Sequence, residues 1–147
     1  MADNPLLTHY ERLYGPFVHM APNDKAIWLR YLMMGGAQLA PFQYDVRVGT
    51  GVQMPSGSSP MELNIAHALT TKRIDALCHV DGKVRIIEVK QRAGLSAIGQ
   101  LIGYGQLFVK TFPQSPPYEL WLVTDQLQPD MSGVLIENNI HYVEVGL

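Results

Sequence analysis

An Asp81-Gly82 pair between two β-rich runs is the feature that most restricts how this chain can fold. The runs are Arg73–Val80 and Lys83–Lys90. An Asp-Gly pair supplies the two positive φ angles that a two-residue type I′ turn requires, so the segment predicts a β-hairpin. With this turn as the loop, Val80 pairs with Lys83, and every further pair keeps the same sum of residue numbers.

This register places two acidic side chains opposite each other. Asp75 faces Glu88, and Arg73 faces Lys90. Because side chains alternate along a strand, these four residues share one face of the hairpin. The other face is predicted to belong to the core, and it carries Ile74, Ala76, Ile87 and Val89.

A pair of carboxylates at this spacing requires a compensating charge. Directly opposed side chains lie about 5 Å apart at Cβ, and like charges there are destabilising. A divalent cation such as Mg²⁺ would offset the repulsion and would keep several of its own waters, one of which Lys90 would hold or activate. The alternative is a solvated ladder in which Arg73 and Lys90 neutralise the two acids.

A helix is predicted directly after the hairpin, over Gly94–Lys110. Two pairs of residues in it are spaced i, i+4 and therefore share a face: Gln100 with Tyr104, and Gly99 with Gly103. A glycine inside a helix costs about 1 kcal/mol relative to alanine. Two glycines on one stripe predict that the helix backbone lies close against the sheet.

The order of these residues resembles a known family. Asp75 on one strand, Glu88-Val89-Lys90 on the next, and Gln100 with Tyr104 on the following helix resemble the PD-(D/E)XK nuclease superfamily. The Gln-x-x-x-Tyr extension is similar to that of the RecB-type exonuclease branch and of some small phage nucleases. The chain departs from the family name at one position, where Ile74 replaces the proline.

The resemblance implies a fold and an activity. The expected fold is a restriction-endonuclease-like α/β fold, with a mixed β-sheet core in the order αβββαβ flanked by helices, as one domain over residues 1–147. The implied activity is Mg²⁺-dependent hydrolysis of DNA phosphodiester bonds, with Mn²⁺ as the alternative metal. Asp75 and Glu88 would bind the metal together with the carbonyl oxygen of Val89. The catalytic residues that the resemblance implies are Asp75, Glu88, Lys90, Gln100 and Tyr104. A helix before the sheet often contributes a further acid in this family, for which Glu11 and Asp24 are the candidates.

The charge distribution bears on a DNA partner. The formal net charge of −2 argues mildly against a nucleic-acid binder. Six of the eleven Lys and Arg residues nevertheless lie between residues 72 and 92, where a local basic zone would meet phosphates. Those expected to contact nucleic acid are Lys72, Arg73 and Arg92. The alternative is that the hairpin carries basic residues for solubility.

The rest of the chain predicts further elements around this centre. Met1–Asn4 is expected to be a short disordered lead. The expected helices are Pro5–Tyr14, Lys25 to about Met34, and Pro129–Asn138. The expected strands are Phe42–Gly49, Tyr118–Thr124 and Ile140–Val145. Met61–Leu69 is compatible with either a short helix or an extended run into the hairpin.

The cysteine content and the absence of a long apolar run bear on the compartment of the protein. A single cysteine, Cys78, excludes an internal disulfide and is expected to be a buried, inert thiol. No run is apolar enough to cross a membrane, and no signal peptide is evident, so we expect a cytoplasmic protein, with a phage-encoded one left open.

The alternative function is a catalytically inactive nuclease-fold module for binding or assembly, such as a phage structural or head-completion component. Such a module should lack Asp75, Glu88 or Lys90, and all three are present. A homodimer stays open.

Overall fold

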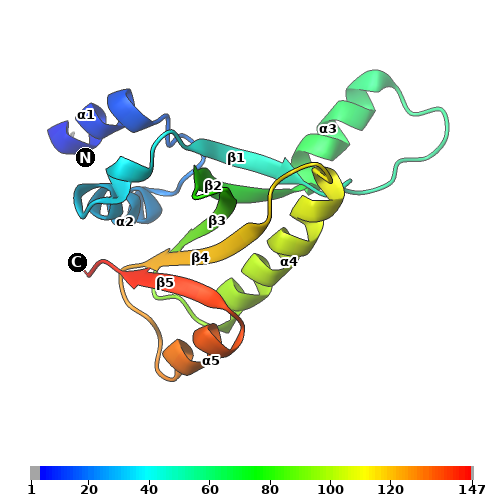
Figure 1. Cartoon of the computed structure of the whole chain (residues 1–147). Coiled ribbons are helices and arrows are strands. Elements are labelled where there is room, and N and C mark those ends of the chain that lie inside the picture. Colours follow the sequence, from blue (N-terminus) through cyan, green and yellow to red (C-terminus); the bar gives the residue numbers. More distant parts are fainter. Residues whose placement is uncertain (1–3, 147) are drawn as a thin grey trace.

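The computed structural model describes residues 4–146 as a five-stranded β-sheet with helices on both faces (Figure 1). The helices are α1 (Pro5–Tyr14), α2 (Pro22–Met33), α3 (Pro60–Thr70), α4 (Leu95–Thr111) and α5 (Met131–Glu137), with a 3₁₀ turn at Gly36–Leu39. The strands are β1 (Gln43–Val48), β2 (Lys72–Val80), β3 (Lys83–Lys90), β4 (Tyr118–Thr124) and β5 (Ile140–Glu144).

The sheet is mixed, and its strands follow one another in chain order. The first three strands pair antiparallel, whereas β3, β4 and β5 pair parallel. The parallel connection from β3 to β4 runs through α4, as a parallel pair requires a crossover. The predicted α/β class, with a mixed sheet flanked by helices, is confirmed.

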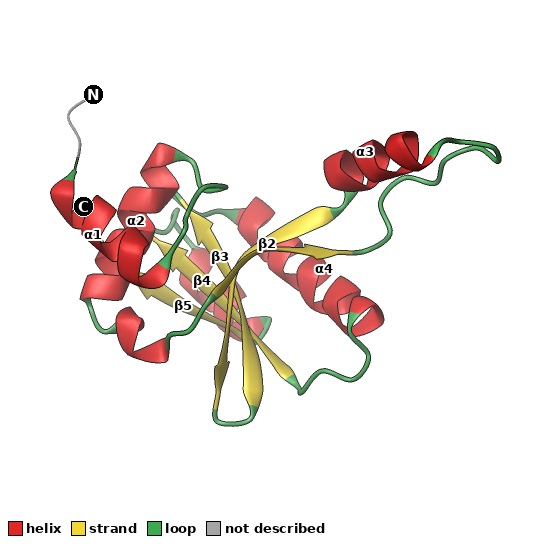
Figure 2. Cartoon of the chain, turned by 90° about the horizontal axis from the view of Figure 1, so that it is seen from above, coloured by secondary structure: helices red, strands yellow, loops and turns green. Residues whose placement is uncertain are grey.

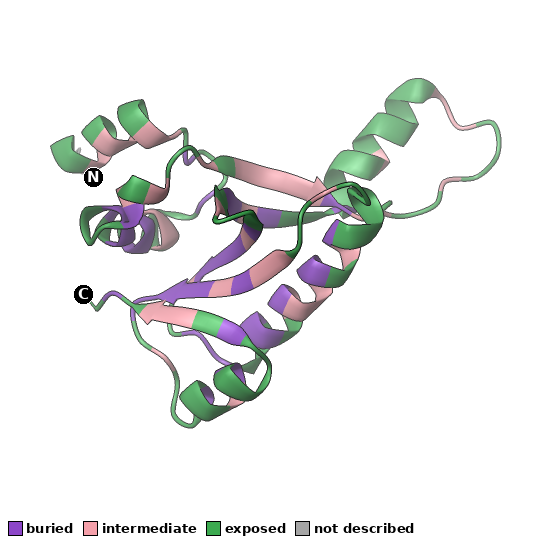
Figure 3. Ribbon diagram, in the orientation of Figure 1, coloured by how far each residue is buried: buried purple, intermediate pink, exposed green. Residues whose placement is uncertain are grey.

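Each face of the sheet has its own apolar core. Helices α1 and α2 cover one face, where Trp28 packs with Ile87 of the sheet. Helices α4 and α5 cover the other face, where Leu101 packs with Leu122 (Figure 2). The buried residues therefore gather on β3, on β4 and on the inner faces of α2 and α4 (Figure 3). Cys78 is buried and free, as the sequence predicts.

The hairpin turn and its register are confirmed. Asp81 and Gly82 have φ angles of 51° and 76°, as a type I′ turn requires. The pairing runs as expected from Val80–Lys83 to Ala76–Ile87. The ladder ends there, so the expected pairs Asp75–Glu88 and Arg73–Lys90 lie beyond it. The carboxylate of Asp75 instead accepts a hydrogen bond from the backbone N–H of Val89.

The strict alternation of faces fails beside Asp75. Ile74, expected on the same face as Ala76, packs in the core beneath α4, whereas Ala76 packs on the α2 side. The same change occurs on the neighbouring strand, where Tyr44 and Val46 lie on opposite faces. Between these two, Asp45 has a φ of +53°, which breaks the pleat. The backbone therefore changes phase at the level of the two aspartates.

Helix α4 lies where the sequence predicts it, but its glycines do not serve the expected purpose. A Cβ added at Gly99 or Gly103 would meet nothing within 4 Å, so the predicted close approach to the sheet is wrong. Gly105 makes the close approach instead, because a Cβ there would lie 2.6 Å from the Tyr118 ring.

Two smaller corrections concern the bounds of α1 and α5. Asn4, expected in a disordered lead, is the N-cap of α1, and its side chain accepts from the N–H groups of Leu6 and Leu7. Residues 1–3 of that lead lie outside the described residues. Helix α5 is shorter than predicted at both ends and does not begin at Pro129.

Helix α3 stands apart from the two cores. The sequence left Met61–Leu69 open between a helix and an extended run, and the segment is helical. It has no buried residue, and Figures 1 and 2 both show it projecting past the ends of β1 and β2. Its exposed large apolar side chains are Met61, Leu63, Ile65 and Leu69.

Candidate functional site

The two acids of the hairpin lie together at the end of the β2–β3 ladder. Asp75 Oδ2 accepts from Val89 N at 2.8 Å, so the carboxylate of Asp75 leans over β3. Glu88 is only 5% exposed, although it carries an ionisable group. Its Oε2 atom is buried and has no hydrogen-bond partner among the described residues. A buried, unpartnered carboxylate oxygen is costly unless a ligand satisfies it.

Electrostatics show that this acid pair is not compensated by the protein. Burial raises the pKa of Asp75, which the Val89 N–H hydrogen bond partly offsets. Burial also raises the pKa of Glu88, and the negative charge of Asp75 and a hydrogen bond shared between the two carboxyl groups raise it further. Lys90 acts in the opposite direction on both groups but does not balance these effects. The pair therefore favours holding a proton or a cation.

Helix α4 contributes the two residues that the motif predicts. Gln100 and Tyr104, one turn apart, line the same cavity of about 290 Å³ as Asp75 and Glu88. Burial, followed by the charges of Glu88 and Asp75, raises the pKa of Tyr104. The Oε1 atom of Gln100 is buried without a partner, like Glu88 Oε2. Two oxygen acceptors thus lack donors in one cavity.

Helix α2 brings a third acid near the pair. The charge of Asp24, in the first turn of α2, raises the pKa of both Asp75 and Glu88. The pKa of Asp24 is itself raised by burial and lowered by Lys90. Glu11, the other candidate acid, instead pairs with Lys25 at 3.3 Å. Of the two candidates, the structure brings Asp24 within electrostatic reach of the pair.

The basic residues predicted near the site occupy different places. Lys90 is half-buried at the end of β3, opposite Thr124 of β4. Lys72 and Arg73 are exposed at the start of β2 and line the cavity. Arg92 is exposed, and its backbone N–H donates to Asp125 at 2.7 Å. Arg92 therefore takes part in the turn after β3, and Lys72 and Arg73 are the basic residues at the cavity.

The donor set suits a hard cation. The oxygens that lack partners belong to a carboxylate and an amide, and Mg²⁺ and Ca²⁺ prefer oxygen ligands. Residues 4–146 hold no group of three or more His, Cys, Asp or Glu side chains arranged for a metal. A cation here would therefore rest on Asp75 and Glu88 and would keep several waters, as Mg²⁺ does.

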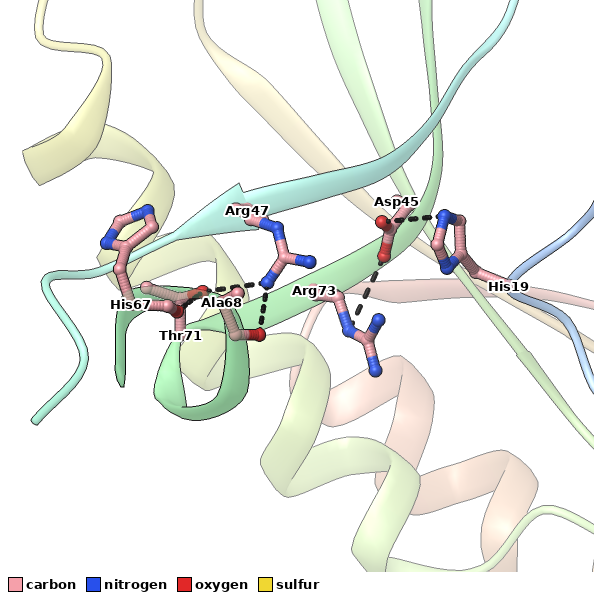
Figure 4. A network of polar contacts seen from close by, with 7 residues as sticks. All are labelled: His19, Asp45, Arg47, His67, Ala68, Thr71 and Arg73. Carbon is pink, nitrogen blue, oxygen red and sulfur yellow. Dashed lines mark hydrogen bonds and ion pairs between the residues drawn. The ribbon is translucent and has the colours of Figure 1, made fainter. Parts of the chain in front are cut away.

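Two ion-pairing residues of the cavity were missed from the sequence. Asp45 of β1 and His19 of the α1–α2 connection line the cavity together with Arg73, and Figure 4 shows the three side chains in contact. Asp45 reads in the sequence as an ordinary outward position of an alternating strand. Its positive φ, which turns it toward the cavity edge, leaves no signal in the residue types. His19 carries no motif at all.

The helices were compared with the length and apolarity that a membrane span requires. Within the part of the chain that the structure describes, none is both long and apolar enough for a transmembrane span.

Comparisons with known proteins find solved structures that are similar to this chain but no sequence relative. No protein-family model and no curated protein matches the chain. A repair endonuclease from Pyrococcus abyssi is similar in structure, with a TM-score of 0.48 and 13% identity over 87% of this chain and 48% of that one. An EndoMS–dsDNA complex is similar with a TM-score of 0.47 and 16% identity, over 91% and 50% of the respective chains. The chain spans about half the length of the solved chains that it matches.

Proposed function

We propose that this chain is a divalent-metal-dependent nuclease of the PD-(D/E)XK type that hydrolyses DNA phosphodiester bonds. The observation that carries the proposal is the buried Asp75–Glu88 pair, with the unpartnered Oε2 of Glu88 inside a cavity. A cation in this cavity would relieve the repulsion that burial imposes on the two acids. The element order and the Gln100–Tyr104 pair on α4 support the same class.

The proposed mechanism divides the work among the residues of the site. If bound here, Mg²⁺ would supply an acidified water and would neutralise charge that builds on the phosphate. Asp75 and Glu88 would hold the cation, and the N–H of Val89 fixes the Asp75 carboxylate. The Lys90 ammonium donates hydrogen bonds to the attacking water or to the scissile phosphate, and it cannot be a ligand because it has no lone pair.

Helix α4 completes the site in this proposal. Gln100 positions a substrate phosphate or the Lys90 ammonium through its amide group. Tyr104 supports the helix face that borders the acid pair. Lys72 and Arg73, at the rim of the cavity, attract the nucleic-acid backbone, which carries one negative charge for each phosphate.

A second candidate function rests on helix α3. Met61, Leu63 and Leu69 are exposed on a helix that has no buried residue. Large apolar side chains that gather exposed on one element mark a surface that binds a partner. This observation favours a role in binding or assembly, in which the nuclease fold is retained without cleavage.

One experiment separates the two functions. The purified protein is incubated with supercoiled, linear and branched DNA, and with RNA, in Mg²⁺, in Mn²⁺ and in chelator. Cleavage of DNA that requires the metal, and that disappears in a Glu88→Gln variant, supports the nuclease. Absence of cleavage of every substrate in both metals would favour the assembly module.

A further inference from the structure

Asp45 occupies an unusual position for a strand residue. It lies in β1 with a φ of +53°, a conformation that is rare for residues other than glycine. Its side chain is only 13% exposed and reaches the edge of the cavity that holds Asp75 and Glu88. An L-residue in this conformation carries a backbone cost, so the surrounding structure must hold it in place.

Two basic side chains meet the carboxylate of Asp45, one at each oxygen. Oδ2 lies 3.1 Å from His19 Nε2, and Oδ1 lies 3.4 Å from Arg73 Nε (Figure 4). The ion pair of Arg73 with Asp45 is made at Nε, and neither terminal nitrogen of the guanidinium donates a hydrogen bond to another of residues 4–146. Among residues 4–146, Arg73 has no second carboxylate within ion-pair distance. The guanidinium is thus held by its inner nitrogen while its outer edge stays available.

The neighbouring arginine shows the contrasting use. Arg47 lies directly opposite Arg73 across the β1–β2 ladder. Its Nη1 donates to the carbonyl oxygen of Ala68 at 2.6 Å and lies 3.2 Å from the hydroxyl oxygen of Thr71, so it closes the C-terminal end of α3 (Figure 4). Of these two paired arginines, Arg47 uses a terminal nitrogen in hydrogen bonds within the fold, whereas among residues 4–146 no such bond is made by Arg73.

We propose that Asp45 is a positioning residue that presents Arg73 to a phosphate group of the nucleic-acid strand, with His19 supporting Asp45 from its other side. This inference rests on the proposed nuclease function, because it assigns a substrate contact of the same cavity. A guanidinium fixed at Nε offers its two terminal N–H groups in the parallel geometry that binds two phosphate oxygens. The phosphate is either the diester next to the scissile one or a terminal phosphate.

The test is the effect of Asp45→Asn on DNA affinity, for which long-range electrostatics and the positioning role predict opposite signs. Asp45→Asn removes a negative charge beside the DNA, so long-range electrostatics alone would leave binding unchanged or strengthen it. If Asp45 positions Arg73, binding weakens, because an amide has one oxygen and cannot face two donors. Asparagine also tolerates positive φ well, which limits the effect on folding. The matched control is Asp81→Asn, in the hairpin turn, where φ is +51°.

DNA binding is measured by gel shift in Ca²⁺ over a range of salt concentrations. We expect Asp45→Asn and Arg73→Gln to bind DNA about tenfold more weakly than wild type, since a charge-assisted phosphate contact is lost. For duplex DNA, each should reduce the slope of log K against log salt by about 0.9. The double variant Asp45→Asn/Arg73→Gln should bind no more weakly than Arg73→Gln alone, and Asp81→Asn should bind like wild type. Arg73→Lys, which keeps the charge but lacks the nitrogen that faces Asp45, should also bind weakly.

The outcomes separate this inference from the proposed function. Unchanged or tighter binding by Asp45→Asn, or wild-type binding by Arg73→Lys, overturns the positioning role while the nuclease proposal stands. Failure of the wild type to bind and cleave DNA overturns both. Comparing linear DNA with a 5′-phosphate and with a 5′-hydroxyl identifies the phosphate: a loss of affinity confined to the phosphorylated end assigns the terminal group, and an equal loss assigns the internal diester.

Discussion

Acidic residues near the two ends of the β2–β3 hairpin lie in opposite electrostatic environments. At the turn end, Glu119 of β4 accepts from Trp121 Nε1 at 2.9 Å and pairs with Lys83 at 3.5 Å. The Trp121 hydrogen bond and the Lys83 ammonium lower the pKa of Glu119. At the open end, burial and mutual repulsion raise the pKa of Glu88 beside Asp75.

This difference distinguishes a structural acid from one that awaits a ligand. Glu119 already has its partners in the folded chain, so its charge stabilises the sheet. Glu88 is more buried, and its Oε2 has no partner among residues 4–146. Strained electrostatics of this kind are typical of functional sites, although ion-pair networks also shift pKa values. Substitutions at the two ends should therefore have opposite effects.

The largest effect is expected at Lys90. Lys90→Ala should reduce single-turnover cleavage about 10³-fold, because the ammonium stabilises charge mainly in the transition state. DNA binding in Ca²⁺ should stay close to that of wild type. Lys90→Arg should also be poor, since a planar guanidinium does not replace a compact ammonium. Lys83→Ala, at the turn end, is the matched control and should cleave normally. Near-wild-type cleavage by Lys90→Ala would rule out the nuclease assignment of this site.

The acids at the two ends should respond in opposite directions when neutralised without metal. In chelator, Glu88→Gln should be at least as stable as wild type, because folding no longer has to bury an ionisable carboxyl group beside Asp75. Glu119→Gln should lose about 0.5–1 kcal/mol, because it loses ion pairs and weakens the Trp121 hydrogen bond. Urea unfolding of the three proteins measures both changes. A clear loss of stability in Glu88→Gln would instead indicate a structural salt-bridge ladder with Lys90.

The pH dependence of these differences should also be opposite. Folding raises the pKa of Glu88, so wild type loses stability as the pH rises above the pKa of Glu88 in the unfolded chain. The stability of Glu88→Gln relative to wild type should therefore grow between about pH 5 and about pH 8. The pKa of Glu119 is lowered, so its contribution is present above the unfolded value and is lost as pH falls through the folded one. Urea unfolding in chelator at several pH values measures both trends. Parallel trends in the two variants would show that the two ends do not differ.

The sequence predicts the hairpin well because its turn depends on local chemistry. The Asp81-Gly82 pair and the period of two determine the register as far as Ala76–Ile87. Prediction fails where the backbone leaves the regular pleat, at Asp45 and Asp75. It also fails at Gly99, where solvent rather than the sheet faces the helix, because residue type alone does not say which face of a largely apolar helix is buried.

The residues of the candidate site likewise fall into those that a local sequence pattern predicts and those that it does not. Residues close together in sequence, such as Glu88 and Lys90, or one turn apart, such as Gln100 and Tyr104, are placed by the period of their element. His19 and Asp24 arrive through the packing of α2 and its preceding loop on the sheet, which no local pattern encodes.

The most direct test of the account is a thermal-shift titration with Ca²⁺ or Mn²⁺ in the absence of DNA. The melting temperatures of wild type and of Glu119→Gln should rise as metal is added. At a metal concentration of 100 times Kd, the bound metal should stabilise each folded protein by about 2.7 kcal/mol. Asp75→Asn keeps an oxygen for the N–H of Val89, so its fold should survive, but it lacks the charge for the cation. Its melting temperature should therefore not move. An equal rise in wild type and Asp75→Asn, or no rise in wild type, would contradict the claim that Asp75 and Glu88 share a metal.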